Sequence, residues 1–289
     1  MTQQEPLVIT VAPTGMVPRR RDHPAVPEQP DEIVADVASA VRAGATCVHV
    51  HARDERGAPA AARGYYAEIV RGLKRASPGI VVSVSTSGRV HHTFEDRSDV
   101  LGLDDGLKPD LASLTLGSLN FPTQASVNEP AMIERLAHAM RARGIVPELE
   151  IFDLGMIDYA HYLVGRHILE PPFVCNLLLG SRGTLAATPF NLALMVGRLP
   201  AGTYWQGAGI GRFQWTINSL AVVSGGHVRT GLEDNLFMDG DRRTPATNEA
   251  LVCRVAGLAA AAGRTLASTA DARRLMGLDS HVSETPDRR

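Results

Sequence analysis

The 289-residue sequence lacks long apolar runs and carries almost no net charge. No apolar segment reaches the roughly 20 residues that a transmembrane helix needs, and the opening residues MTQQEPLVIT do not have the pattern of a secretory signal peptide. The net charge of −2 and the isoelectric point near 6.6 argue against nucleic acid or an anionic membrane as a partner. We therefore expect a soluble, cytoplasmic protein.

Cysteine is also scarce. The three cysteines, Cys47, Cys175 and Cys253, lie far apart in the sequence, and the first two fall in segments that we expect to be core strands. Widely spaced cysteines in a cytoplasmic protein are expected to stay reduced. We therefore predict three free and buried thiols.

What the sequence does contain is a regular alternation of strand and helix patterns. Hydrophobic residues make up 44% of the chain and charged residues 21%, which allows a sizeable core. Short apolar strands are predicted to begin near residues 8, 47, 80, 111, 148, 173, 203 and 227, and a helical pattern follows each of them. Eight βα units in this length predict an α/β fold of the (β/α)₈ or TIM barrel type, with a doubly wound open sheet as the alternative. No composition shift divides the chain, so we expect one barrel domain over 1–289 with terminal tails at 1–6 and 278–289.

The second predicted strand contains two histidines, His49 and His51, in the segment CVHVHARD (47–54). Side chains alternate between the two faces of a strand, so both imidazoles project from one face. At that spacing they can bind one metal ion. The strand ends just after them, where parallel α/β folds place their chemistry. We favour a metal-binding pair over two hydrogen-bonded core histidines.

Polar residues at the ends of the other strands complete the candidate site, because a buried polar side chain is costly unless it is used. In strand order they are Thr14; Ser85 and Thr86; Ser113 and Thr115, with Asn120 nearby; Glu148 and Glu150; Asn176; Gln206; and Arg229, Glu233 and Asp234.

The end of the last strand supplies the expected third metal ligand. A catalytic zinc site needs three protein ligands and an open position, and in a closed barrel strand eight lies beside strand one and near strand two. Glu233 is the predicted ligand and Asp234 the alternative, while an acidic pair at a helix N-terminus is the structural explanation. Arg229 is expected to pair with Asp234, so that this carboxylate can act as a general base. A purely structural ion pair is the competing interpretation.

Two glycine-rich segments are candidates for binding an anion. GAGIGR (207–212) follows the seventh predicted strand, and we expect Gly209, Gly211 and Arg212 to contact the phosphates of a cofactor. Its glycine spacing is not that of a dinucleotide-binding fingerprint, and a tight strand-to-helix turn is the alternative. GSRG (180–183) is the second candidate.

Six motifs, taken together and in this order, resemble those of the β-keto acid cleavage enzymes. They are VHVHARDERG (48–57), VSVSTSGR (82–89), SLTLGSLNF (113–121), VPELEIFD (146–153), GAGIGR (207–212) and GGHVRTGLEDN (225–235). The resemblance extends from about Leu7 to Met276. It implies a zinc-dependent TIM barrel, assembled as a homotetramer, that condenses a β-keto acid with acetyl-CoA to give acetoacetate and a new acyl-CoA.

The resemblance also implies roles for single residues. Carried over position by position, these are zinc ligands at His49, His51 and Glu233; a catalytic pair at Arg229 and Asp234; a substrate contact at Ser85; a hydroxyl at Ser113, where a studied member has threonine; and a catalytic glutamate at Glu148, chosen over Glu150. Zinc would polarise the keto group, Asp234 would remove a C2 proton, and a retro-Claisen step would release acetoacetate after attack on acetyl-CoA. Other divalent ions suit the same ligands.

Val17 marks a departure from one member of the family. There, a glutamate at this position receives the ammonium group of an amino-substituted substrate, and an apolar side chain cannot pair with a cation. We therefore expect a β-keto acid without that amino group. Arg19, Arg20 and Arg21 could bind a second carboxylate, although a solvated run is the preferred interpretation. A zinc-dependent hydrolase and a non-catalytic metabolite-binding barrel are the alternative functions.

Overall fold

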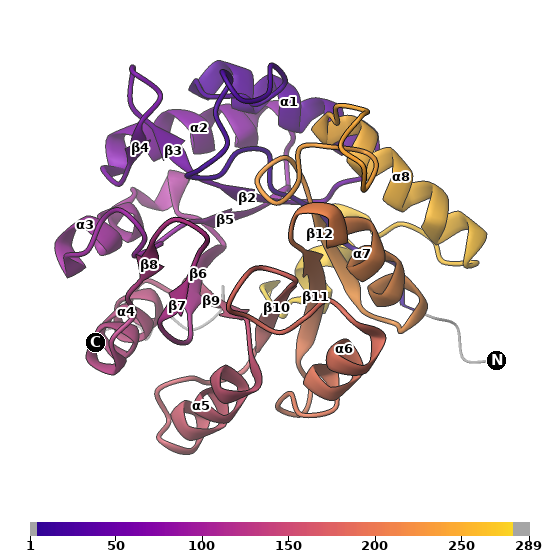
Figure 1. Cartoon of the computed structure of the whole chain (residues 1–289). Coiled ribbons are helices and arrows are strands. Elements are labelled where there is room, and N and C mark those ends of the chain that lie inside the picture. The colour runs from indigo at the N-terminus through magenta and orange to yellow at the C-terminus, as the bar shows by residue number, and fades with distance from the viewer. Residues whose placement is uncertain (1–4, 280–289) are drawn as a thin grey trace.

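The computed structural model describes residues 5–279, and most of the two expected tails falls outside this range. Eight parallel strands close into a barrel in the order β1-β12-β11-β10-β9-β6-β5-β2, and helices surround it (Figure 1). The predicted TIM barrel is therefore confirmed. Among the described residues, none of the helices is long and apolar enough to cross a lipid bilayer.

The elements follow the predicted alternation. The barrel strands are β1 (Ile9–Val11), β2 (Cys47–Val50), β5 (Val81–Val84), β6 (Leu111–Thr115), β9 (Val146–Ile151), β10 (Val174–Leu179), β11 (Tyr204–Gly209) and β12 (His227–Thr230). The helices are α1 (Pro30–Arg42), α2 (Arg63–Ala76), α3 (Phe94–Asp99), α4 (Pro130–Ala142), α5 (Leu154–Gly165), α6 (Pro189–Val196), α7 (Gln214–Val223), α8 (Asn248–Ala261) and α9 (Thr269–Leu275).

The strands are buried on both faces, as expected for a parallel barrel wrapped in helices. In β10, for example, all six residues from Val174 to Leu179 are buried. Their outward side chains pack under the helices, and their inward side chains fill the barrel. Inside the barrel the packing includes polar groups: Thr10 Oγ1 donates to Gln206 Oε1 at 2.7 Å, and Gln206 Nε2 donates to Glu148 Oε1 at 2.9 Å. This buried network lies directly beneath the candidate site.

Closure of the barrel brings its first and last strands together. β1 pairs with β12, with Thr10 opposite Arg229, and on its other edge β1 pairs with β2, with Thr10 opposite Cys47. The outer helices follow the same arrangement, so that α1 and α8 lie side by side (Figure 1). The loop after β12 is thereby placed next to the histidines of β2, as the sequence predicted for Glu233.

Three local features differ from the expectations. Cys253 is exposed on α8, so the prediction that all three thiols are buried is wrong for this residue; Cys47 and Cys175 are buried in β2 and β10. The helical pattern expected after the third predicted strand is broken into α3 and two 3₁₀ turns, η1 (Val100–Gly102) and η2 (Asp105–Leu107). Two short hairpins were not predicted, β3 (Ala52–Arg53) with β4 (Pro59–Ala60) and β7 (Leu119–Asn120) with β8 (Ala125–Ser126). Two-residue strands are too short to give a periodic signal.

Asp36 on α1 is expected to make the stability of the barrel depend on pH. It accepts a hydrogen bond from Asn248 Nδ2 at 2.6 Å, and burial raises its pKa to about 6. Because the pKa is higher in the folded than in the unfolded chain, this group favours the folded state at low pH. That contribution is lost as the pH rises from about 4 through about 6. We expect Asp36→Asn to raise the free energy of unfolding by up to about 3 kcal/mol at pH 7.5 and by little at pH 4.

Urea denaturation of both proteins at the two pH values measures this difference. The exposed Asp241→Asn is the matched control and should show no such pH-dependent gain. An equal effect of Asp36→Asn at both pH values would rule out ionisation of Asp36 as the cause.

Candidate active site

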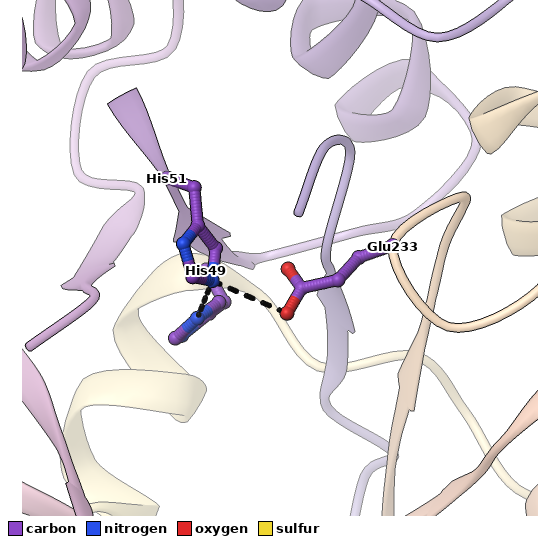
Figure 2. Close-up of side chains that lie close together, drawn as sticks. All are labelled: His49, His51 and Glu233. Atoms are coloured by element: carbon purple, nitrogen blue, oxygen red, sulfur yellow. Dashed lines mark hydrogen bonds and ion pairs between the residues drawn. The ribbon is translucent and has the colours of Figure 1, made fainter. Parts of the chain in front are cut away.

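The two histidines lie at the C-terminal end of β2 and face the same point. His49 is fully buried within the strand, and His51 follows its last residue with 6% of its surface exposed. Their Nε2 atoms are 3.4 Å apart. Glu233 approaches them from the loop after β12, with its Oε1 3.3 Å from His51 Nε2 (Figure 2). One ligand atom from each of the three side chains lies within 4.8 Å of the others.

The donor atoms of these three residues fit a divalent metal ion. His49 Nδ1 faces Glu148 Oε2 at 3.2 Å, which assigns the imidazole proton to Nδ1 and leaves a lone pair on Nε2. The Nε2 atoms of both histidines and Oε1 of Glu233 lie close together, so a divalent cation between them would receive a lone pair from each of the three side chains. Glu233 Oε2 is buried and has no hydrogen-bond partner among residues 5–279, so this oxygen remains available to a metal ion. Two imidazoles and one carboxylate are a common ligand set of catalytic zinc.

The loop after β1 is held tightly against Glu233. A Cβ on Gly15 would lie 2.5 Å from Glu233 Cγ, so only glycine allows this approach. Arg53, which is 2% exposed, donates to the carbonyls of Gly15, Pro18 and Gly57 and to the hydroxyl of Thr14. Arg53 is therefore a positioning residue that fixes the loop at the edge of the site.

Arg229 and Asp234 form the ion pair that the sequence predicted. Arg229 Nε donates to Asp234 Oδ2 at 2.9 Å, and Nη2 donates both to Asp234 Oδ1 at 3.1 Å and to Glu233 Oε1 at 2.7 Å. The guanidinium is 1% exposed. Arg229 thus orients Glu233 toward the histidines and Asp234 toward the open cavity.

The two carboxylates differ in pKa. Burial opposes ionisation of Glu233, but Arg229 and the two histidines outweigh it and hold the pKa of Glu233 well below its ordinary value. Burial raises the pKa of Asp234, and the neighbouring charge of Glu233 adds to the rise, so that Arg229 only partly offsets it. A carboxylate with a raised pKa is the better proton acceptor of the two.

Glu148 and Glu150 lie on the same face of β9 but at different depths. Glu148 is 1% exposed beneath His49, where it also accepts hydrogen bonds from Ser83 and Gln206. Glu150 lies two residues further along the strand, accepts a hydrogen bond from Thr115 Oγ1 at 2.6 Å and lines the cavity. Glu148, the sequence-based choice for a catalytic glutamate, contacts His49 but is not among the residues that line the cavity.

We expect Glu148→Gln to weaken metal binding by roughly 10–100-fold, because the anionic acceptor that orients His49 Nδ1–H is lost. Titration with a competing metal chelator measures the affinity. Glu150→Gln is the matched control, since Glu150 lies on the same strand without a hydrogen bond to His49, and it should leave the affinity nearly unchanged. Equal losses in both variants would show that buried charge, rather than the hydrogen bond, governs the affinity.

A cavity of about 320 Å³ opens above the histidines. Of the residues predicted from the sequence, it is lined by Val17, His51, Ser85, Glu150, Gly211, Arg229, Glu233 and Asp234. Its volume is at the lower end of the range for small-molecule sites. The structure therefore brings together residues from β9 and β12 and from the loops after β1, β2, β5, β11 and β12.

Other predicted site residues lie away from this cavity. Thr86 N donates to Ser113 Oγ at 3.2 Å, and both residues are buried without lining the cavity. Thr115 is engaged with Glu150, and Asn120 is exposed on the β7–β8 hairpin. The Thr86–Ser113 and Thr115–Glu150 contacts support the walls of the site.

The glycine-rich turn after β11 fits each of the two interpretations, a tight turn and an anion-binding loop, in part. A Cβ on Gly209 would lie 2.2 Å from the carbonyl oxygen of Phe213, so this glycine is required by the tight turn. Arg212 is exposed with its guanidinium 4.9 Å from the ring of Phe213, and it does not line the cavity, whereas Gly211 does. The second glycine-rich segment contributes Ser181 to the lining.

The three arginines after β1 form ion pairs with acidic residues that are close to them in the sequence. Arg19 pairs with Glu28 at 2.9 Å, Arg20 pairs with Glu32, and Arg21 lies 3.8 Å from Asp22. These contacts support the preferred interpretation of a surface run, and none of the three arginines lines the cavity.

Several cavity residues were not recognised from the sequence. They include Met16, Arg89, Phe121, Phe152, Phe237 and Arg242. Only Arg89 had a usable signal, since it ends the polar loop STSGR (85–89) directly after a predicted strand. The aromatic residues come from loops whose paths depend on distant contacts.

The sequence model of the β-keto acid cleavage enzyme family matches residues 6–278. A 3-oxoadipate:acetyl-CoA acetyltransferase of Cupriavidus necator is 40% identical over 283 residues, which cover 97% of each chain. A 3-keto-5-aminohexanoate cleavage enzyme of Acetoanaerobium sticklandii is 34% identical over 276 residues, 95% of this chain and 99% of the relative. The solved ternary complex of ObcA with a C4-CoA adduct and oxalate has a TM-score of 0.79 at 21% identity, over 88% of this chain and 68% of that one. At this identity the likeness concerns the barrel fold alone.

Proposed function

The chain belongs to the β-keto acid cleavage enzyme family, and we propose that it performs acetyl-CoA-dependent cleavage with a divalent metal ion held by His49, His51 and Glu233. The reaction condenses a β-keto acid with acetyl-CoA and yields acetoacetate and a new acyl-CoA. The observation that carries this proposal is the convergence of two imidazole nitrogens and a carboxylate beside a second, arginine-oriented carboxylate. Zinc is the proposed metal.

The chain's own residues divide the work of the reaction. A bound divalent ion would act as a Lewis acid that polarises the keto group and acidifies the adjacent carbon. Asp234 faces the cavity, has a raised pKa, and would accept the proton from C2 of the β-keto acid at one of its carboxylate oxygens. Arg229 would hold Asp234 in place through the bidentate contact.

Ser85 is the proposed hydrogen-bond donor to the substrate. It lines the cavity, and its Oγ accepts a hydrogen bond from Ser87 N at 3.1 Å. With its acceptor side engaged, the hydroxyl proton is free to donate to the substrate carboxylate or to a developing oxyanion. Ser113 would act indirectly, because its Oγ accepts a hydrogen bond from Thr86 N, next to Ser85 in the sequence.

An acid with an anionic or neutral side chain is the proposed substrate. Val17 lines the cavity where a cationic substrate would need a carboxylate. The Cupriavidus relative is named for 3-oxoadipate, which has a second carboxylate. A homotetramer completes the proposal and is supported by the family resemblance, and we also propose a cytoplasmic location.

The test is a reaction panel with the zinc-loaded protein. We expect acetoacetate to form from a β-keto acid with a neutral or anionic side chain only when acetyl-CoA is also present, and a cationic analogue to react poorly. Breakdown of the acid without acetyl-CoA would identify a hydrolase instead. Absence of turnover with every acid would favour a barrel that only binds a metabolite.

A further inference from the structure

Arg89 extends from the loop after β5 and is stacked inside the cavity. Its guanidinium carbon lies 3.3 Å from the centroid of the Phe121 ring. Phe121 in turn packs edge-on against Phe152, with ring centroids 5.9 Å apart, and all three side chains line the cavity. The guanidinium plane is therefore held in position by aromatic packing.

No carboxylate neutralises this guanidinium within the described part of the chain. Its Nε is buried without a hydrogen-bond partner, and no carboxylate of residues 5–279 lies within ion-pair distance. Burial lowers the pKa of Arg89, while Glu233, Glu150 and Asp234 across the cavity partly offset that effect. A partly buried cation without a partner is costly, so an anion bound in the cavity would stabilise it.

The stacked geometry suits one class of anion. Packing on an aromatic ring uses the face of the guanidinium and leaves its N–H groups in the plane, where they can bind a carboxylate with two parallel hydrogen bonds. We propose that Arg89 is the specificity-determining residue that binds a second carboxylate, at the end of the β-keto acid farthest from the histidines. This inference rests on the proposed function, since it assumes that the β-keto group lies at His49 and His51.

The phosphates of acetyl-CoA are the other possible source of an anion. The thioester has to reach the reacting carbon near Asp234, and the pantetheine arm separates it from the phosphates. Arg89 lies in the same cavity as Asp234, which leaves no room for that separation. Arg242 also lines the cavity, and because it is exposed it suits phosphates that extend into solvent better.

The experiment compares two acids of equal length, 3-oxoadipate and 3-oxohexanoate, with the wild type, Arg89→Gln and Arg242→Gln. We expect Arg89→Gln to lower kcat/KM for the diacid by roughly 10–100-fold, chiefly through KM, and to change the monoacid little. Arg89→Lys should recover part of the loss, because it keeps the charge without the planar fork. Arg242→Gln should not discriminate between the acids.

Three results would overturn the inference. An equal loss for both acids would assign Arg89 a structural role, which thermal melting of the variant would corroborate. A variant that raised the KM for acetyl-CoA but not for acetyl-pantetheine would show that Arg89 binds the phosphates of acetyl-CoA. Calorimetric binding of 3-oxoadipate without acetyl-CoA separates this inference from the proposed function. Binding that depends on Arg89 without turnover would retain the inference and reject the function, whereas binding that is independent of Arg89 would reject the inference.

Discussion

Replacement of Asp234 by asparagine is expected to lower kcat by roughly 10²–10⁴-fold, the range usual for loss of a general base. Asparagine keeps the size of the side chain and can still accept a hydrogen bond from Arg229, but it cannot take the C2 proton. Steady-state formation of acetoacetate at saturating zinc and acetyl-CoA measures the effect. The zinc content of the variant should equal that of the wild type, because Glu233 is the proposed ligand.

The pH dependence gives a second readout for the same residue. Asp234 acts as a base only when it is ionised, and its pKa is raised by burial. The wild-type kcat/KM should therefore fall as the pH is lowered through that raised pKa, and the residual activity of Asp234→Asn should lack this acid limb. Turnover of the variant close to that of the wild type would exclude Asp234 as the base. Loss of zinc from Asp234→Asn would instead support Asp234 as the metal ligand.

Replacement of His51 by alanine is expected to remove most of the bound metal and to lower kcat/KM on the order of 10³-fold, because Lewis-acid polarisation of the keto group contributes several kcal/mol. His51 is the better target of the two histidines, since His49 also anchors the buried Glu148 network and its loss would disturb the barrel interior. Elemental analysis of the purified protein, together with the acetoacetate assay, measures both effects.

The control for His51→Ala is His138→Ala, an exposed histidine on α4 outside the cavity. It should keep both the metal and the activity. A His51→Ala protein that remained fully loaded with zinc and fully active would remove His51 from the ligand set. In that case the close approach of the three side chains would need another explanation, such as a shared proton between the imidazoles.

Much of the site was accessible from the sequence because it depends on local rules. The two-residue period of a strand places His49 and His51 on one face, and the end of the predicted strand places them at the reactive rim of the barrel. Glu233 could be chosen because closure of the barrel makes the last strand a neighbour of the first. These steps need only the order of the elements and the side-chain period.

The choice between Glu148 and Glu150 shows where such rules stop. Both residues share one face of β9, so periodicity cannot separate them. Their depth relative to His49 depends on the stagger between strands, which arises only when the barrel closes. The structure places Glu148 behind His49 and Glu150 at the cavity.

The sequence by itself determined the eight βα units, the histidine pair and the Arg229–Asp234 pair, because each follows from spacing along one segment. Only the tertiary structure decided how the loops meet: Gly15 against Glu233, and Arg89 stacked on Phe121 without a carboxylate partner among the described residues. Those contacts join loops from different strands, and the path of a loop is set by what it packs against rather than by its own sequence. The specificity of the site therefore depends on the part of the molecule that local patterns describe least.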